Sequence, residues 1–193
     1  MNIIISGVGG QGTILASKIL AAGAVLDGKN ARTGETIGMS QRGGCVVSHV
    51  RTGNVHSAYI PAGKADLLLS FELCEGARNL PLLKKGGQAI INIATVMPVS
   101  ATLGKTAYDA AKMKEYIVQN SHAYFVDADN IARECGSIKA ANIVLIGAAF
   151  GLGALDISRE NLIQAIRDNV KAKFFDLNVK AFDAGVKAAK ELK

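Results

Sequence analysis

Two glycine-containing stretches carry the residues that could bind an anionic ligand. The first, GVGGQG, has the G-x-G-x-x-G spacing, which gives a tight turn and leaves the backbone bare enough for a phosphate to approach. Its glutamine adds an uncharged donor and acceptor at the mouth of the loop. The same spacing also occurs in strand-to-helix turns that serve packing alone. The candidate binding residues of this stretch are Gly7, Gly9, Gly10, Gln11 and Gly12.

The second stretch, GMSQRGG, begins at Gly38 and places one fixed cation among hydroxyl and amide groups. The guanidinium of Arg42 keeps its proton and presents a planar fork of donors that suits phosphate or carboxylate. The alternative is an arginine that tethers one loop to another. The candidate binding residues of this loop are Ser40, Gln41, Arg42, Gly43 and Gly44.

The residues on either side of the first stretch predict a strand, a loop and a helix. Ile3-Ile4-Ile5 is an uninterrupted run of β-branched residues, as in a parallel strand covered on both faces. From Thr13 to Leu26, apolar residues recur at helical intervals. The first amides of that helix are expected to point toward the loop, where they favour an anion.

Two further polar residues each have a functional and a structural interpretation. Glu35 lies 23 residues after Gly12, close to where a dinucleotide-binding fold places the acid that holds a ribose. It can equally be a solvated loop residue. Asn142 stands near the start of an apolar segment, Lys139–Leu155, that predicts a fully buried helix. Its amide is expected to satisfy neighbouring backbone groups, or else to reach a ligand or partner.

Histidines and paired acids elsewhere are given structural interpretations. His49 and His56 have no further ligands nearby in the sequence, so we expect ordinary strand histidines and no metal site. Asp127 and Asp129 follow an expected strand and are interpreted as caps of a short helix. A catalytic acid pair is the alternative for these two residues.

The overall pattern predicts an α/β fold in a single domain over residues 1–193, Rossmann-like, with three α/β/α layers around a mostly parallel sheet. The expected exception is an antiparallel hairpin, formed by Cys45–Arg51 and Val55–Ile60 around a Thr-Gly-Asn turn. Further strands are expected at Lys64–Phe71, Gln88–Ile93 and His122–Val126, and further helices at Glu72–Asn79, Thr106–Val118, Ser158–Asp168 and Phe174–Leu192.

Composition and charge limit the classes of protein to which the chain can belong. The net charge is +6, but Lys173, Lys180 and Lys187 recur on one helical face, and no aromatic residues alternate with the lysines as a base-stacking platform would require. No nucleic acid partner is therefore expected. No apolar run is long enough to cross a bilayer and no signal segment precedes the first strand, so we expect a cytoplasmic protein without a membrane partner. The three cysteines have neither zinc nor iron-sulfur spacing.

The chain resembles the gamma-type subunits of 2-oxoacid:ferredoxin oxidoreductases at three sequences: GVGGQG from Gly7, GMSQRGG from Gly38, and Ser48-His49-Val50-Arg51. Within that family, GMSQRGG is most similar to the beta subunits of indolepyruvate:ferredoxin oxidoreductases, whereas pyruvate and oxoglutarate members more often have a Tyr-Gly-Pro version of this loop. The resemblance spans nearly the whole chain and includes Ala65-Asp66-Leu67 and Ala141-Asn142.

The resemblance implies a role in the oxidative decarboxylation of a 2-oxoacid to its acyl-CoA, with ferredoxin as the electron acceptor. Indolepyruvate or another arylpyruvate is the substrate implied, with pyruvate, 2-oxoglutarate or a branched-chain oxoacid as alternatives. Thiamine diphosphate, magnesium and iron-sulfur clusters are implied for a large alpha subunit, because this chain has no Gly-Asp-Gly motif and no clustered cysteines. The chain is then an accessory subunit that is inactive alone and holds none of these cofactors.

The two glycine loops are expected, on this resemblance, to line the subunit interface. There Arg42 and the amides of Gly9–Gly12 are expected to meet an anionic group such as a CoA phosphate. No catalytic residue is assigned to the chain itself. Two other classes remain open from the residues: a stand-alone reductase that binds NAD through the first glycine loop and Glu35, and a purely structural subunit whose glycine loop is empty.

Overall fold

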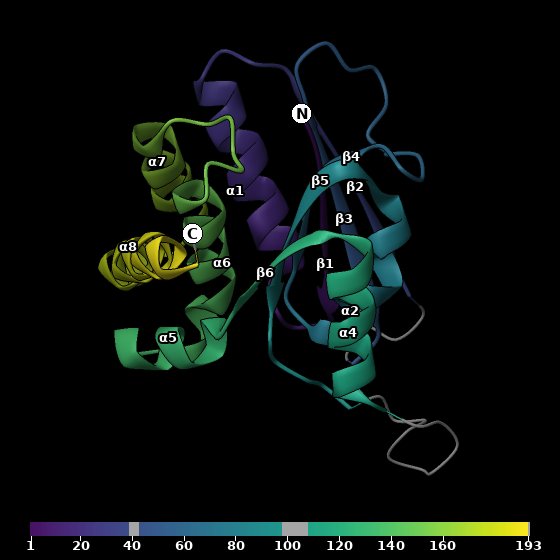
Figure 1. The fold of residues 1–193 in the computed structure, drawn as a ribbon. Helices are drawn as coiled ribbons and strands as arrows, with labels where there is room; N and C mark the ends of the chain where they lie inside the picture. Colours follow the sequence, from purple (N-terminus) through teal and green to yellow (C-terminus); the bar gives the residue numbers. More distant parts are fainter. Residues whose placement is uncertain (39–42, 98–107, 193) are drawn as a thin grey trace.

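Within the described residues, six strands form one sheet, and helices cover both of its faces (Figure 1). The structure is a computed structural model that describes residues 1–38, 43–97 and 108–192. The α/β/α layering predicted from the sequence is confirmed. The strands are β1 (Asn2–Val8), β2 (Ala31–Ile37), β3 (Cys45–Thr52), β4 (Ala65–Ser70), β5 (Leu83–Asn92) and β6 (His122–Val126). The helices are α1 (Thr13–Leu26), α2 (Leu73–Asn79), α4 (Ala110–Asn120), α5 (Ala128–Cys135), α6 (Ala141–Gly151), α7 (Arg159–Asn169) and α8 (Phe175–Glu191), with short 3-10 turns η1 (Leu80–Leu82), η2 (Ile138–Ala140) and η3 (Ala172–Phe174).

The strand order is β2-β3-β1-β4-β5-β6. Strands β1, β4, β5 and β6 run parallel to one another, while β3 is antiparallel to both β1 and β2. The carboxyl ends of β1, β2, β4, β5 and β6 therefore lie at one edge of the sheet, which we call the carboxyl edge.

One strand of the predicted hairpin is confirmed, but it pairs with a different partner. We expected Cys45–Arg51 to pair with Val55–Ile60, whereas β3 pairs with the preceding strand β2. Strand β3 has β1 on its other side, so neither of its edges is free for the segment that follows it. Side chains satisfy that segment in place of a strand partner: Arg51 Nη1 donates to the carbonyls of Ser57 and Tyr59, and His49 Nδ1 accepts from the backbone N–H of Ile60.

The two faces of the sheet have separate cores, as the apolar run at the start of the chain predicts. Ile3 and Ile5 face α1, α5, α6, α7 and α8, whereas Ile4 lies on the opposite face, toward α2 and α4. All three isoleucines are fully buried. An uninterrupted apolar strand is therefore required here, because successive side chains enter different cores.

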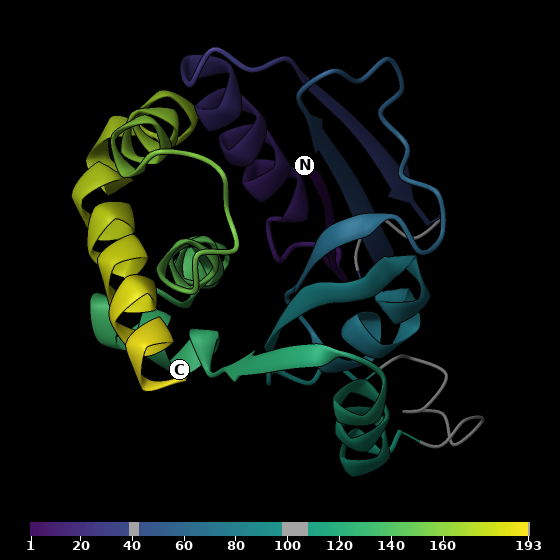
Figure 2. The same cartoon turned by 45° about the horizontal axis from the view of Figure 1, so that its top comes forward.

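Helix α6 is surrounded by protein, as predicted for the segment 139–155. Every residue from Asn142 to Ala149 is buried, and α8 lies outside α6 (Figure 2). The helix itself is shorter than expected because residues 138–140 form the 3-10 turn η2 and the helix ends at Gly151.

The helix expected from Thr106 begins later, at Ala110. Asp109 is its N-cap, and the Asp109 carboxylate accepts a hydrogen bond from the backbone N–H of Lys112 at 3.1 Å. A short polar side chain that caps the first turn fixes the start of a helix, which explains the shift. Residues 106 and 107 lie outside the described ranges. Across the described helices, none combines the length and apolar character needed to cross a bilayer.

Candidate functional site

The first glycine stretch forms the turn between β1 and α1 at the carboxyl edge of the sheet. Gly10 and Gly12 have φ angles of 104° and 84°, in the left-handed region that glycine enters without strain. Gly12 is the N-cap of α1, and among the described residues no side chain caps this helix start. The N–H groups of the first turn of α1 are thus left for another acceptor, and the helix dipole favours an anion there.

Gln11 uses its amide inside the loop. Its Oε1 accepts from the backbone N–H of Val8 at 2.7 Å, and its Nε2 donates to the carbonyl of Phe71 at 3.1 Å. A Cβ at Gly7 would stand only 2.9 Å from Gln11 Oε1. We expected Gln11 to offer its donor and acceptor at the mouth of the loop. In the structure, its side-chain amide instead connects the loop to the residue after β4. The missing side chain of Gly7 leaves space for the Gln11 amide.

The two glycine stretches meet through their backbones. The N–H of Gly9 donates to the carbonyl of Gly44 at 2.8 Å. Gly43 lies in the same turn, with a φ angle of 74° and open space around its α-carbon. The residues of the second stretch that carry its side-chain chemistry, Ser40, Gln41 and Arg42, lie outside the described residues.

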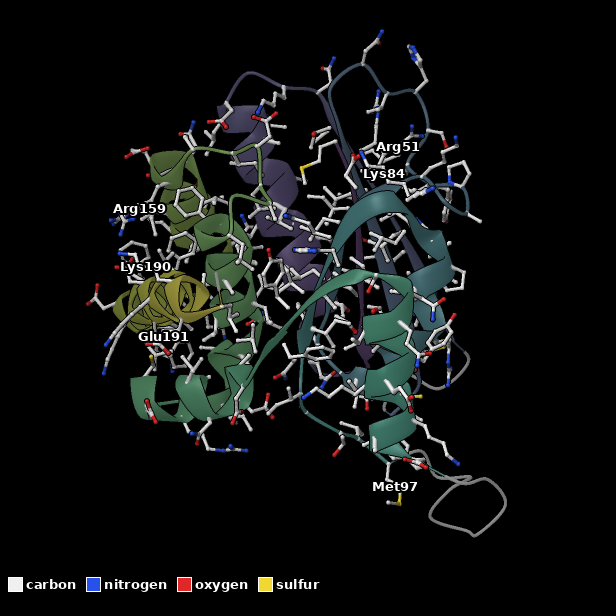
Figure 3. The ribbon with its side chains drawn as sticks, viewed as in Figure 1. Arg51, Lys84, Met97, Arg159, Lys190 and Glu191 are labelled. Carbon is white, nitrogen blue, oxygen red and sulfur yellow. The ribbon has the colours of Figure 1, made fainter. Side chains whose placement is uncertain are left out.

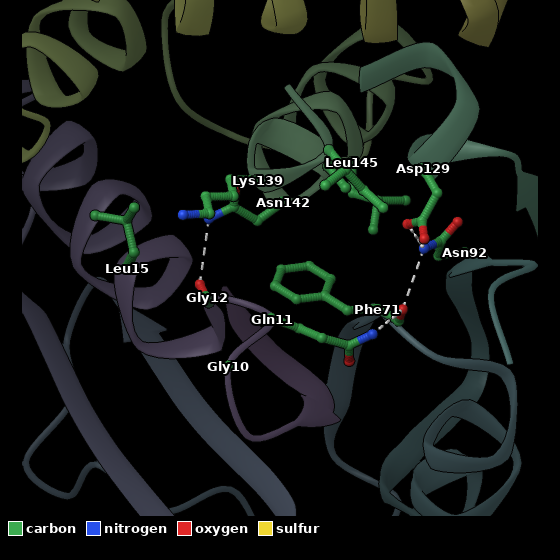
Figure 4. Close-up of a pocket in the computed structure, with 12 residues that line it drawn as sticks. Gly10, Gln11, Gly12, Leu15, Phe71, Asn92, Asp129, Lys139, Asn142 and Leu145 are labelled. Carbon is green, nitrogen blue, oxygen red and sulfur yellow. Dashed lines mark hydrogen bonds between the residues drawn. The ribbon is translucent and has the colours of Figure 1, made fainter. Parts of the chain in front are cut away.

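A cleft of about 550 Å³ opens beside the first glycine stretch (Figure 4). We call it the glycine cleft; it is lined by Gly10 and Gly12, by Phe71 at the end of β4, by Asn92 at the end of β5, and by residues of α5, η2 and α6. Helix α1 packs on one face of the sheet and α2 on the other, although their preceding strands β1 and β4 are neighbours. Such a reversal leaves a crevice beyond the carboxyl ends of the strands, where ligands of open α/β sheets bind.

Asn142 closes one wall of the glycine cleft. Its Nδ2 points to the carbonyl of Gly12 at 3.4 Å, and its Oδ1 accepts from the N–H of Ile143 at 2.9 Å. A Cβ at Gly12 would be 2.6 Å from that Nδ2 atom. The structure therefore brings together two candidates that are 130 residues apart in the sequence.

Asn92 and Asp129 form the opposite wall; we assigned Asn92 no role from the sequence, and Asp129 only a helix cap or one of a catalytic acid pair. The amide Nδ2 of Asn92 donates to Asp129 Oδ1 at 2.8 Å and to the carbonyl of Phe71 at 3.2 Å. Its Oδ1 accepts from the N–H of Ala128. One asparagine, 1% exposed, thus joins the ends of β4 and β5 to the start of α5. The position of Asn92 at the end of a buried parallel strand is the signal that could have identified it.

Lys139 supplies the one Lys or Arg side chain among the described residues that line the glycine cleft. It lies on the turn η2, next to the start of α6. With the uncapped helix start of α1 on one side and Lys139 on the other, the cleft combines backbone donors with a cation. Asp127 takes no part: its carboxylate caps α5 by accepting from the N–H of Asn130 at 3.1 Å.

Glu35 is displaced from the position a dinucleotide-binding fold would give it. It lies on the edge strand β2 and pairs with Ser48 on β3, and Ser48 pairs with Ile5 on β1, so Glu35 is level with the middle of β1 and two strands away from it. Two strand spacings amount to about 10 Å. The Glu35 carboxylate accepts from the hydroxyl of Ser17 at 3.3 Å. It therefore does not reach the glycine turn as a ribose-binding acid would.

Two buried carboxylates lie at the start of α2, and one of them, Glu72, supports the loop that follows β5. Glu72, 1% exposed, accepts through Oε1 from the N–H of Val96 at 3.1 Å and from the hydroxyl of Tyr108 at 2.6 Å. Burial raises the pKa of the Tyr108 hydroxyl, which keeps it a donor. Glu75 Oε2 has no hydrogen-bond partner among the described residues, while its Oε1 lies 3.4 Å from Arg78 Nη1.

We expect Glu75→Gln to raise the melting temperature at pH 8 and to lose this advantage toward pH 4. Burial raises the pKa of the Glu75 carboxyl, opposed by Arg78 and helped by Glu72. When the folded state raises the pKa of a carboxyl, the free energy of unfolding of the protein falls as the pH rises. The fall begins near the unfolded pKa of that carboxyl, about 4.3, and ends above its folded pKa. Thermal unfolding followed by circular dichroism at both pH values tests this. The exposed Glu134→Gln is the control, and an equal or lower melting temperature for Glu75→Gln at pH 8 contradicts the assignment.

The fold and the site place the chain among Rossmann-like α/β proteins that carry a glycine turn after the first strand. The family model described as pyruvate ferredoxin/flavodoxin oxidoreductase matches residues 2–188. The indolepyruvate oxidoreductase subunit IorB of Thermococcus kodakarensis is 42% identical over 195 residues, which cover 99% of this chain and 96% of that protein. The chain therefore belongs to the pyruvate ferredoxin/flavodoxin oxidoreductase family and is an accessory subunit of a 2-oxoacid:ferredoxin oxidoreductase.

Solved structures agree with this assignment. The gamma subunit of the keto/oxoacid ferredoxin oxidoreductase from Geobacter sulfurreducens has a TM-score of 0.74 and 29% identity, with 98% of both chains covered. The 2-oxoglutarate:ferredoxin oxidoreductase from Magnetococcus marinus has a TM-score of 0.76 at 24% identity, which shows a shared fold. The match covers all of this chain but 31% of that longer one. Among the described residues, no group of three or more His, Cys, Asp or Glu could hold a metal ion.

Proposed function

We propose that this subunit presents the glycine cleft to the anionic part of CoA in an enzyme that oxidises an arylpyruvate such as indolepyruvate. The observation that carries the proposal is the uncapped start of α1, which opens with Gly10 and Gly12 into a cleft that also holds Lys139. Backbone N–H groups at a helix start and a nearby cation are the donors that phosphate groups bind. Arg42, on the adjoining glycine stretch, is proposed from the sequence as a second cation.

The remaining chemistry belongs to a larger partner in this proposal. Thiamine diphosphate with magnesium activates the 2-oxoacid for loss of carbon dioxide, and iron-sulfur clusters carry the released electrons to ferredoxin. Support comes from the 42% identity to an indolepyruvate oxidoreductase subunit, which favours an aryl side chain on the oxoacid. A cytoplasmic location and the absence of nucleic acid and membrane partners complete the proposal.

We expect Lys139→Ala to raise the KM for CoA about tenfold with little change in kcat, because a hydrogen bond to a charged group is worth roughly 1.5–3 kcal/mol. The assay is indolepyruvate-dependent dye reduction by the larger subunit mixed with each variant, across a CoA titration. Lys180→Ala is the matched control, since Lys180 is exposed on α8 and away from the glycine cleft. An unchanged KM for CoA in Lys139→Ala contradicts the CoA assignment. A wild-type chain that adds no turnover contradicts the whole proposal.

A further inference from the structure

Large apolar side chains are exposed on both sides of the glycine cleft at the carboxyl edge of the sheet. We call them the apolar rim: Ile14 and Ile37 on the α1 side, and Ile93, Val96 and Met97 on the β5 side. Met97 is 59% exposed and projects beyond the strand ends (Figure 3). Single exposed apolar residues are ordinary, but a set gathered around one opening indicates an interaction surface.

The β5 side of the apolar rim is held in place by buried groups. The N–H of Val96 donates to the buried Glu72 carboxylate at 3.1 Å, and the N–H of Leu73 donates to the carbonyl of Ala94 at 3.0 Å. Residues 93–97 belong to neither a strand nor a helix, yet the start of α2 anchors them at two points. A loop fixed in advance with apolar side chains outward loses little conformational entropy when a partner covers it.

The α1 side of the apolar rim borders a second hollow. This hollow, of about 410 Å³, lies across the glycine turn from the glycine cleft and is lined by Gly9, Gly10 and Gly12, by Thr13, and by three apolar side chains. The apolar ones are Ile14 and Ile37, which are exposed, and Val46, which is buried. Its lining suits an apolar side chain from another protein, since buried apolar anchors in such pockets carry most of the energy of an interface.

We propose that the apolar rim docks on the larger catalytic subunit, with an apolar side chain of that subunit in the hollow at Ile14 and Ile37, so that the glycine cleft faces it. This inference rests on the proposed function and adds the surface through which it operates. The rim is continuous with the cleft, because Ile93 directly follows Asn92 and Ile14 belongs to the first turn of α1. In the Magnetococcus marinus protein, the same fold accounts for 31% of a longer chain, so there a unit of this fold is part of one polypeptide with further protein.

The test compares aspartate substitutions at matched exposure. Ile37→Asp and Met97→Asp place a charge on the apolar rim. The controls are Val25→Asp and Val118→Asp, whose wild-type side chains are 58% and 57% exposed. These two residues lie near the ends of α1 and α4, away from the carboxyl edge. Affinity for the purified larger subunit is measured by calorimetry, turnover by indolepyruvate-dependent dye reduction, and folding by thermal unfolding of the isolated chain.

Each rim variant is expected to bind the larger subunit at least about tenfold more weakly, with the turnover recovered at saturating variant, while the two controls stay within about twofold. The docking surface is overturned if the rim variants bind the larger subunit as tightly as the wild type does, or if the control variants lose as much affinity as the rim variants. The proposed function remains intact in that case if the wild-type chain supports turnover. A wild-type chain that neither binds nor supports turnover overturns the proposed function itself. An isolated chain that dimerises and becomes monomeric in Met97→Asp, with unchanged binding to the larger subunit, assigns the rim to a second copy and also overturns the inference.

Discussion

Gly185→Ala is expected to lower the stability of the chain by about 3 kcal/mol or more, because α6 and α8 cross with their backbones in contact at this residue. A Cβ at Gly185 would stand 2.0 Å from the carbonyl oxygen of Val144 and 2.9 Å from the N–H nitrogen of Ala148. Gly147 on α6 faces α8 in the same way, with a Cβ position 2.1 Å from the carbonyl oxygen of Phe182. Backbone atoms cannot rotate aside as a side chain can, so the helices must separate.

The separation would affect the most buried helix of the molecule, since the residues of α6 from Asn142 to Ala149 are all buried. Alanine forms helix better than glycine by about 1 kcal/mol, which offsets only part of the loss. For a chain of this length, the melting temperature should fall by roughly 6–12 °C or more. Thermal unfolding followed by circular dichroism measures this.

A control variant and a double variant test whether the loss of stability comes from the contact between α6 and α8. Lys187→Ala changes an exposed position on the same helix and should move stability by less than about 0.5 kcal/mol. Gly147→Ala/Gly185→Ala should cost less than the sum of its single variants, because one separation of the helices relieves both contacts. A melting temperature for Gly185→Ala within about 2 °C of the wild type would refute the crossing geometry.

The sequence predicted those parts of the fold that depend on local patterns. The run Ile3–Ile5 indicated a strand with two buried faces, and the apolar segment from Lys139 indicated a buried helix; the structure confirms both. The hairpin partner of Cys45–Arg51 was wrong because two segments flanked it, 31–37 and 55–60, and the choice depends on which edge of β3 is free. That information is in the tertiary structure, since β1 takes the other edge.

The candidate site shows the same division. Gly12 was identified as part of the glycine motif and Asn142 as a polar residue in an apolar segment, and the structure places them in contact. Asn92 and Lys139 have no such pattern, because a single polar residue at a strand end or in a turn is common in any sequence. Their place in the glycine cleft follows from strand order, which brings the ends of β1, β4 and β5 together.

Gly12→Ala is expected to reduce the activity of the reconstituted complex at least tenfold while the chain still folds. Two effects add at this residue: its φ of 84°, which costs an L-residue roughly 1–2 kcal/mol, and a Cβ position 2.6 Å from Asn142 Nδ2. The conflicting atom is the end of a side chain, so Asn142 can move, but the turn before α1 must shift with it. Since the donors of the glycine cleft are the first amides of α1, displacement of about 1 Å is enough to weaken anion binding substantially.

Two further variants separate strain from contact. Gly28→Ala has a comparable φ of 77° with nothing near its Cβ position, and it lies at the far end of α1, so it should lose stability without losing activity. Gly12→Ala/Asn142→Ala removes the close contact and should regain part of the stability, while the strain remains. Melting temperature and indolepyruvate-dependent dye reduction across a CoA titration report the two quantities. If Gly12→Ala keeps the activity of Gly28→Ala at every CoA concentration, the glycine turn serves packing alone and the amides of α1 have no part in binding.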